Sequence, residues 1–232
     1  MTTPYTAEVG RKFHADGSPC SFAGTTVISF IDVAMPIARM GAWLQEEIRQ
    51  QPFADKFSML PPSSFHMTVI QLLNDQDRTP QRWTPLLALA TPMDKICSFM
   101  GRRVASVVPP ASIAMRFTGI QRLGNLAFQL EPADDDVATT LRRYRNAVAG
   151  ATGVCLPDHE HYQFHISLAY RLMVLTAGEQ QQLDELCNRA DSFVQQAAPC
   201  IMLASPQCTF FTDMCHFVPI DNMNNTFGAH HE

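Results

Sequence analysis

One short pattern occurs twice in this chain, about a hundred residues apart, and it constrains the fold more than any other feature. Residues 65–69 read Phe-His-Met-Thr-Val, and residues 164–168 read Phe-His-Ile-Ser-Leu. Side chains alternate between the two faces of a strand, so the histidine and the hydroxyl residue share one face and the apolar residues share the other. Each pattern therefore predicts a strand with an apolar core face and a polar face that carries an imidazole beside a hydroxyl.

The first half of the chain predicts strand, helix, patterned strand and helix, in that order. The expected elements are a strand over 25–32, a helix over 36–50, the patterned strand over 65–73, and a helical stretch from 79 to about 103 that breaks near Thr91-Pro92.

The second half repeats this order. The expected elements are two strands within 112–132, a helix over 134–149 that stops at Gly150, the patterned strand over 162–172, a helix from the capping box of Thr176 and Glu179 to about 196, and a final strand over 207–220. We therefore expect an α+β, bilobal, duplicated fold in which two mainly antiparallel sheets flank a central cleft, with the helices outside.

Length and composition are consistent with one domain. The 232 residues are 46% hydrophobic and 17% charged, which is enough apolar material for a packed core. Residues 1–22 are polar and contain several Gly and Pro, so we expect a leader or covering segment there. Residues 23–220 are expected to form a single bilobal domain, followed by a flexible tail over 221–232.

Charge and cysteine content limit the class of partner and compartment. The formal net charge of −5 gives no overall attraction to a long nucleic acid or an anionic membrane, although a local basic cleft stays possible. The first residues contain no apolar core of a secretory signal, and no window approaches the roughly 18 apolar residues of a spanning helix. Seven cysteines without a CxxC pair indicate reduced thiols. We expect a cytoplasmic protein.

Two imidazoles that face each other across a cleft can divide an acid–base reaction between them. With an ordinary pKa near ~6.5, one imidazole can accept a proton while the other donates one. The hydroxyls of Thr68 and Ser167 can donate hydrogen bonds to an anion held between them, as in an oxyanion hole. A phosphodiester suits this arrangement, and the chemistry calls for neither a metal nor a cofactor.

The two patterns resemble the signature of the two-histidine (2H) phosphoesterase superfamily. Its members include the LigT-like enzymes, the bacterial 2′–5′ RNA ligases and cyclic phosphodiesterases, with two His-apolar-Thr/Ser-apolar motifs in a bilobal α+β fold. The lead-in "KFHADGSPCSFAGTTV" over 12–27 is similar to a little-characterised subgroup in which a segment containing Asp-Gly precedes the first strand. The resemblance spans roughly residues 20–220.

The resemblance implies metal-independent chemistry on 2′,3′-cyclic phosphates or on 2′–5′ and 3′–5′ phosphodiesters. It transfers four catalytic positions to this chain: His66, Thr68, His165 and Ser167. It also implies a small nucleotide or an RNA end as substrate, without identifying which, and it leaves the oligomeric state open.

Three further residues are candidates for substrate binding. Arg171 has the same strand parity as His165 and Ser167, so it could reach the cleft and bind phosphate as a bidentate donor. Tyr162 and Phe211 are candidates for stacking on a base.

Two alternatives stay open. The segment "DHEHYQFH" could form a metallohydrolase site from His159, His161 and His165, with Asp158 or Glu160. Alternatively, the chain could be a 2H-fold protein that binds a nucleotide without turnover. A matched acid and base favour catalysis, since binding alone does not need them.

Overall fold

The computed structural model describes residues 4–220, which contain four α-helices and a nine-stranded sheet. In chain order the elements are β1 (Gly24–Phe30), α1 (Pro36–Arg49), β2 (Phe57–Met59), β3 (His66–Asn74), α2 (Met93–Ala105), β4 (Ser112–Gln121), β5 (Asn125–Pro132), α3 (Asp135–Thr152), β6 (Phe164–Arg171), α4 (Ala177–Ala197), β7 (Cys200–Ala204), β8 (Gln207–Asp213) and β9 (His216–Pro219).

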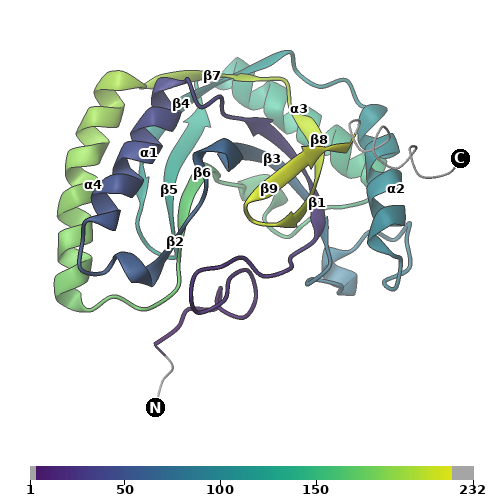
Figure 1. Cartoon of the computed structure of the whole chain (residues 1–232). Coiled ribbons are helices and arrows are strands. Elements are labelled where there is room, and N and C mark those ends of the chain that lie inside the picture. The colour runs from purple at the N-terminus through teal and green to yellow at the C-terminus, as the bar shows by residue number, and fades with distance from the viewer. Residues whose placement is uncertain (1–3, 221–232) are drawn as a thin grey trace, which may run out of the picture.

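The strands form one curled antiparallel sheet in the order β7-β4-β5-β6-β3-β1-β8-β9 (Figure 1), and β2 pairs with the C-terminal residues of β6. The α+β class and the antiparallel pairing are confirmed. The two expected sheets are joined, because β3 and β6 pair through Met67 and Ile166. The strands that carry the two patterns are therefore neighbours at the centre of the sheet.

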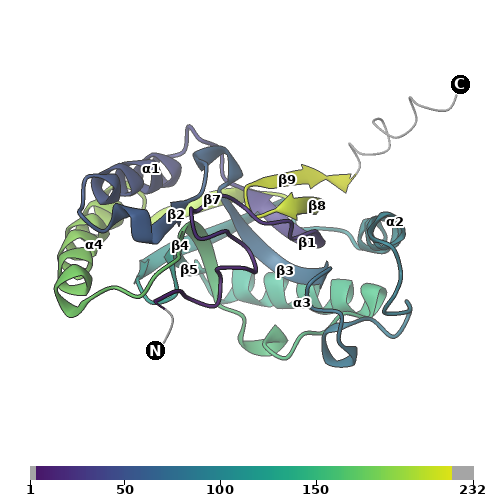
Figure 2. The same cartoon turned by 60° about the horizontal axis from the view of Figure 1, so that its bottom comes forward.

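The helices cover the outside of the curled sheet in two pairs. α1 and α4 pack on each other and contact β6 and β4, while α2 and α3 contact each other and lie against β1, β8 and β3. Figure 2 shows the two pairs on opposite sides of the molecule. Each pair buries an apolar stripe, for example Leu44 and Ile48 of α1 and Leu183 and Leu186 of α4.

Two helix boundaries differ from the expected ones. Residues 80–91 contain only a short 3₁₀ turn, Pro80–Arg82, and the helix begins after Pro92, since Pro85 and Pro92 both remove backbone donors. The helix expected to stop at Gly150 continues to Thr152. It ends at Gly153, whose φ of 71° gives the left-handed cap that favours glycine. The capping box of Thr176 and Glu179 is present.

The strands after α4 also differ. The single strand expected over 207–220 is a hairpin of β8 and β9, and the backbone N–H of Cys215 donates to the Asp213 carboxylate in the turn between them. Two short strands, β2 and β7, were not expected. They have three and five residues, and they pair with β6 and β4, respectively.

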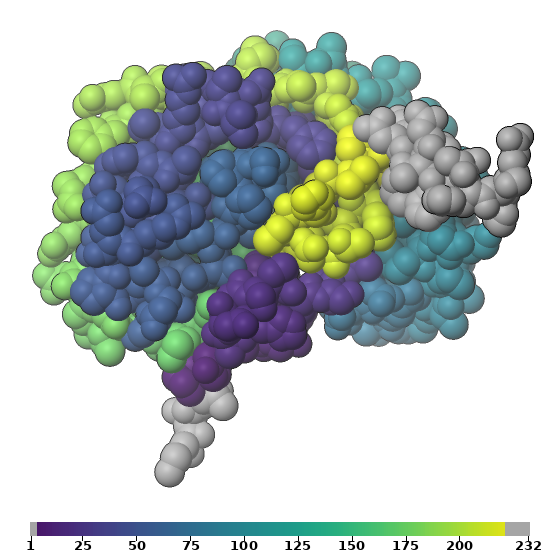
Figure 3. Space-filling model, viewed as in Figure 1, coloured from purple at the N-terminus to yellow at the C-terminus, as the bar shows by residue number. Residues whose placement is uncertain are grey.

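The segment before β1 folds back on itself and packs against the sheet. Tyr5 bridges to Met173, and Phe13 is completely buried. In Figure 3 this purple segment lies directly beneath the yellow β8–β9 hairpin. The expected tail over 221–232 lies outside the described residues, as do residues 1–3. Within residues 4–220, the helices are all too short or too polar to cross a membrane.

Candidate active site

The two histidines are held in the same way. His66 Nδ1 lies 2.7 Å from the Ser64 carbonyl oxygen, and His165 Nδ1 lies 2.9 Å from the Gln163 carbonyl oxygen. A carbonyl oxygen can only accept, so each Nδ1 carries the hydrogen and donates it two residues back along the chain. In the neutral ring, Nε2 of each histidine is therefore left with a free lone pair for proton exchange.

Each pattern is followed by a one-residue bulge at the same position. Val69 has no partner in the register of β3 with β1, and Leu168 has none in the register of β6 with β5. An extra residue reverses the side-chain alternation from that point on. As a result Gln71 and Tyr170, each five residues after its histidine, face the cleft.

A buried polar side chain binds the carbonyl of each bulged residue. Gln45 of α1 donates to the carbonyl of Leu168 at 2.7 Å and also to that of Leu60 at 2.7 Å. Arg145 of α3 donates to the carbonyl of Val69. A bulged residue leaves the regular ladder, so its backbone groups need partners of this kind. Each half of the chain thus has a buried side-chain donor at its bulge, a glutamine in one case and an arginine in the other.

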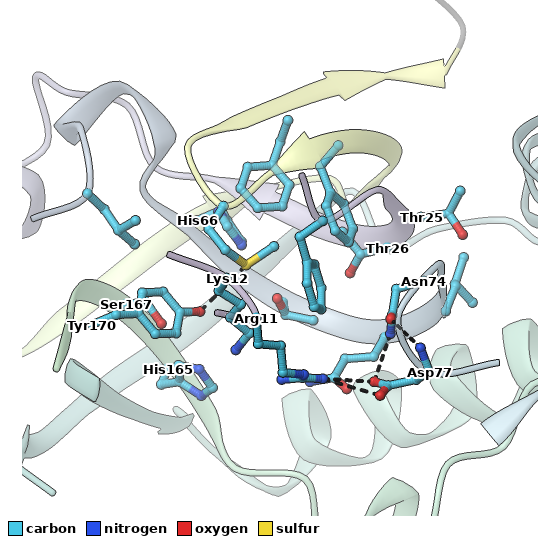
Figure 4. Close-up of a pocket in the computed structure, with 18 of the residues that line it drawn as sticks. Arg11, Lys12, Thr25, Thr26, His66, Asn74, Asp77, His165, Ser167 and Tyr170 are labelled. Carbon is cyan, nitrogen blue, oxygen red and sulfur yellow. Dashed lines mark hydrogen bonds and ion pairs between the residues drawn. The ribbon is translucent and has the colours of Figure 1, made fainter. Parts of the chain in front are cut away.

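The patterned strands open onto one cavity of about 280 Å³ (Figure 4). Its lining includes the histidine–hydroxyl quartet, which we define as His66, Thr68, His165 and Ser167. Of the three residues considered for substrate binding, Tyr162 and Phe211 also line this cavity. The structure therefore brings together six of the seven residues singled out from the sequence.

The expectation that Arg171 reaches the cleft is wrong. Its side chain is buried on the other face of β6, where the guanidinium donates to the Arg122 carbonyl and lies 5.6 Å from the Phe57 ring centroid. The physical reason is the bulge at Leu168, which reverses the parity between Ser167 and Arg171. Tyr170 occupies the cleft-facing position instead.

Both hydroxyls of the quartet have polar neighbours. Ser167 Oγ accepts a hydrogen bond from Asn125 Nδ2 at 3.0 Å, which leaves its own hydrogen free to donate. Thr68 and Gln71 bond to the hydroxyl of Tyr162, whose pKa burial raises to about 12. Tyr162 therefore stays neutral, and the guanidinium of Arg145 lies 4.8 Å from its ring centroid.

Three cations line the cavity, and sequence reasoning did not identify them. They are Arg11, Lys12 and Arg82. Together with Asp77 they give a formal lining charge of +3 − 1 = +2, in a protein whose formal net charge is −5. Lys12 Nζ lies 4.6 Å from the ring centroid of Tyr170, so a positive charge stands beside the patterned strand β6.

The N-terminal segment holds Lys12 in place through local structure. Phe13 is fully buried and its ring centroid is 5.1 Å from that of Tyr170. Gly17, in a turn with φ of 83°, accepts a hydrogen bond from Ser58 Oγ at 2.8 Å. The Asp-Gly pair at 16–17 indicates this turn in the sequence. The position of Lys12 at the cleft could not be predicted in the same way, because it depends on tertiary packing.

Burial lowers the pKa of both imidazoles. The pKa of His66 falls to about 4, mainly through burial and further through the charge of His165, against the opposing hydrogen bond to Ser64. The pKa of His165 is also lowered by burial, and the charge of Lys12 adds to this. An anion placed between the rings would favour their charged forms and raise both values.

The residues of the metal alternative do not converge. His159 and His161 lie in the 3₁₀ turn His159–His161, and neither lines the cavity that contains His165. His159 Nε2 is 2.8 Å from Asn146 Oδ1. Across residues 4–220, no group of three or more His, Cys, Asp or Glu side chains is arranged to hold a metal ion.

Comparisons with known proteins identify one matching family model and several solved structures with similarity to this chain. A family model of 2H-phosphodiesterase type, described as a domain of unknown function (DUF1868), matches residues 12–125. No curated protein matches the chain. The crystal structure of the conserved protein of unknown function ATU0111 from Agrobacterium tumefaciens superposes with a TM-score of 0.86 at 25% identity, covering 94% of this chain and 93% of that chain.

Two other solved structures align over most of the chain with lower scores. TT0787 of Thermus thermophilus has a TM-score of 0.38 at 15% identity and covers 80% of this chain and 85% of its own. Usb1 of Kluyveromyces marxianus with uridine monophosphate has a TM-score of 0.42 at 10% identity and covers 86% of this chain and 98% of its own.

Proposed function

We propose that the chain is a metal-independent phosphodiesterase that acts on a 2′,3′-cyclic phosphate or on a 2′–5′ or 3′–5′ nucleotide diester. The match of residues 12–125 to a 2H-phosphodiesterase family model supports phosphodiesterase activity in general. The observation that carries the more specific proposal is the matched pair of imidazoles, His66 and His165, each with Nδ1 bonded to a backbone carbonyl and both lining one cavity.

In the proposed reaction a water molecule attacks phosphorus while one neutral imidazole takes its proton at Nε2. The other imidazole, protonated, gives a proton to the departing ribose oxygen, so the P–O bond breaks and a phosphomonoester and a hydroxyl remain. Thr68 and Ser167 would donate to the non-bridging oxygens, and Lys12 would add a positive charge beside them. Anionic substrate raises the low pKa of the imidazole that must act as acid.

The remaining lining supports a nucleotide as the substrate. Tyr162, Phe211, Phe22 and Phe217 supply aromatic surface in the same cavity, and base–aromatic stacking is worth about 1–3 kcal/mol per base. A cavity of about 280 Å³ is near the lower end of ligand pockets. It suits a nucleotide or the end of an RNA rather than the side of a long duplex.

The decisive experiment is hydrolysis of a panel of 2′,3′-cyclic nucleotides and 2′–5′ and 3′–5′ dinucleotides with EDTA present, with the His66→Ala and His165→Ala variants run in parallel. We expect turnover of at least one substrate class by the wild type in EDTA, and strong loss in both variants. Tight binding without turnover would instead support the non-catalytic alternative. Activity that disappears with EDTA and returns with zinc or manganese would contradict the metal-independent mechanism.

A further inference from the structure

The cavity has a second polar end, away from the quartet. There Arg11 Nη2 lies 3.0 Å and 3.3 Å from the two carboxylate oxygens of Asp77, and Arg82 Nε lies 3.7 Å from one of them. Asn74 Nδ2 donates to the same carboxylate at 3.1 Å. Figure 4 shows Arg11 extending toward Asp77 and Asn74, on the opposite side of the cavity from His165.

This end keeps a net positive charge and free hydrogen-bond donors. Arg11, Arg82 and the adjacent Lys12 form ion pairs with two carboxylates, Asp77 and Glu8, which gives +3 − 2 = +1. The side chains of Arg11 and Arg82 are 38% and 39% exposed, so solvent or a ligand can reach them. A guanidinium has five N–H donors, and Asp77 occupies only part of this capacity. Two such groups directed to one point can bind a phosphate in a bidentate manner.

The second end is separate from the quartet along the same strand. Thr68 and Asn74 are six residues apart on β3, and both line the cavity. Aromatic rings occupy part of the intervening lining: Phe22 and Phe211 stack with centroids 6.2 Å apart, and the Arg11 guanidinium lies 5.1 Å from the Phe22 ring. The sequence of groups along the cavity is thus imidazoles and hydroxyls, aromatic rings, then arginines.

We propose that Arg11 and Arg82 bind a second phosphate of the substrate. The substrate is then a nucleotide or short oligonucleotide end that carries a phosphate ester beyond the scissile one, either a terminal 5′-phosphate or the next internucleotide phosphate. The identity of the scissile group rests on the proposed function, but the second phosphate site is a matter of binding and can be measured without turnover.

The test is calorimetric binding of three product-type ligands: adenosine 3′-monophosphate, adenosine 3′,5′-bisphosphate, and the dinucleotide ApA with a 3′-phosphate. We expect the wild type to bind at least one of the two-phosphate ligands about 10- to 100-fold more tightly than the monophosphate, the size of one to two charge-assisted hydrogen bonds. The two-phosphate ligand that binds more tightly than the monophosphate shows whether the site binds a terminal 5′-phosphate or an internucleotide phosphate.

Arg82→Gln is the informative variant, because Arg82 lies outside the N-terminal segment that positions Lys12. It should reduce the preference for the two-phosphate ligand to within about threefold, whereas the exposed Arg102→Gln on α2 should leave it intact. Asp77→Asn removes the competing carboxylate and should increase the preference.

Equal affinities for all three ligands, or an unchanged preference in Arg82→Gln, would overturn the second phosphate site. Retained preference in a protein that hydrolyses no diester would contradict the proposed function and leave the site standing.

Discussion

Met67 pairs directly with Ile166 across the antiparallel strands β3 and β6. In an antiparallel register this places Ser167 across from His66, and His165 across from Thr68. The two imidazoles therefore lie on one diagonal of the quartet and the two hydroxyls on the other. A tetrahedral group at the centre would meet an imidazole on each of two sides and a hydroxyl on each of the others, which is the arrangement that an in-line displacement at phosphorus requires.

The first prediction concerns the imidazoles. His66→Ala and His165→Ala should each lower kcat by about 10²- to 10⁴-fold, the usual contribution of a general acid or base. The double variant should lose much less than the product of the two effects, because the residues serve one proton-transfer sequence. His161→Ala is the matched control and should retain activity. Near-full activity in His165→Ala would remove the two-histidine mechanism, and strong loss in His161→Ala would favour the metal alternative.

The hydroxyls should contribute less than the imidazoles. Thr68→Ala and Ser167→Ala are each expected to lower kcat about 10- to 10³-fold, since each removes one donor to the anionic transition state. Thr68→Ser and Ser167→Thr keep the donor and should stay within about tenfold of the wild type. Steady-state kinetics on the substrate found in the panel would measure this. Equal losses in Ser167→Thr and Ser167→Ala would point to packing rather than donation.

Stability should depend on pH through His66. Its pKa is about 4 in the folded protein against the ordinary 6.5, so the unfolded chain binds more protons between these values. The contribution of His66 to the free energy of unfolding is fully present above pH 6.5. It is lost as pH falls toward 4, and the loss is at most about 3 kcal/mol. Urea unfolding of wild type and His66→Gln at pH 7.5 and 4.5 would measure it. The variant should lose less free energy of unfolding over this interval, and an equal loss would contradict the low pKa.

Lys12 should act on both the substrate and His165. Lys12→Met removes a cation from the cavity, so KM should rise and the dependence of kcat/KM on salt should weaken. Burial is the main reason that the pKa of His165 is low, but the charge of Lys12 contributes, so the pKa should rise in the variant. NMR titration of the imidazole would show this. Lys12→Arg keeps the charge and should preserve the wild-type pKa, and a shift in both variants would indicate displacement of the segment instead.

The bulge in β6 should depend on Gln45, which is fully buried. Gln45→Met keeps the length and apolar contacts of the side chain but leaves the carbonyls of Leu60 and Leu168 without this donor. We expect a loss of about 1–3 kcal/mol in the free energy of unfolding. The exposed Gln181→Met on α4 should change it by less than about 0.5 kcal/mol. Equal stability of the two variants would show that the bulge does not need Gln45.

Much of the fold follows from local sequence. Alternating apolar residues specify β3 and β6, β-branched residues specify β1, and capping signals with apolar stripes specify α1, α3 and α4, because these features depend on residues a few positions apart. The repeated pattern also identified the quartet, since a histidine and a hydroxyl two residues apart on a strand must share a face.

Tertiary structure decided what local sequence leaves open. The bulges at Val69 and Leu168 depend on buried donors from α3 and α1, and they turned Tyr170 rather than Arg171 toward the cleft. The cations of the cavity come from a turn-rich N-terminal segment and from the loop after β3, which have no periodic signal. Strand parity is a local property only while the ladder is regular, and charge gathers in a cleft only when distant segments pack together.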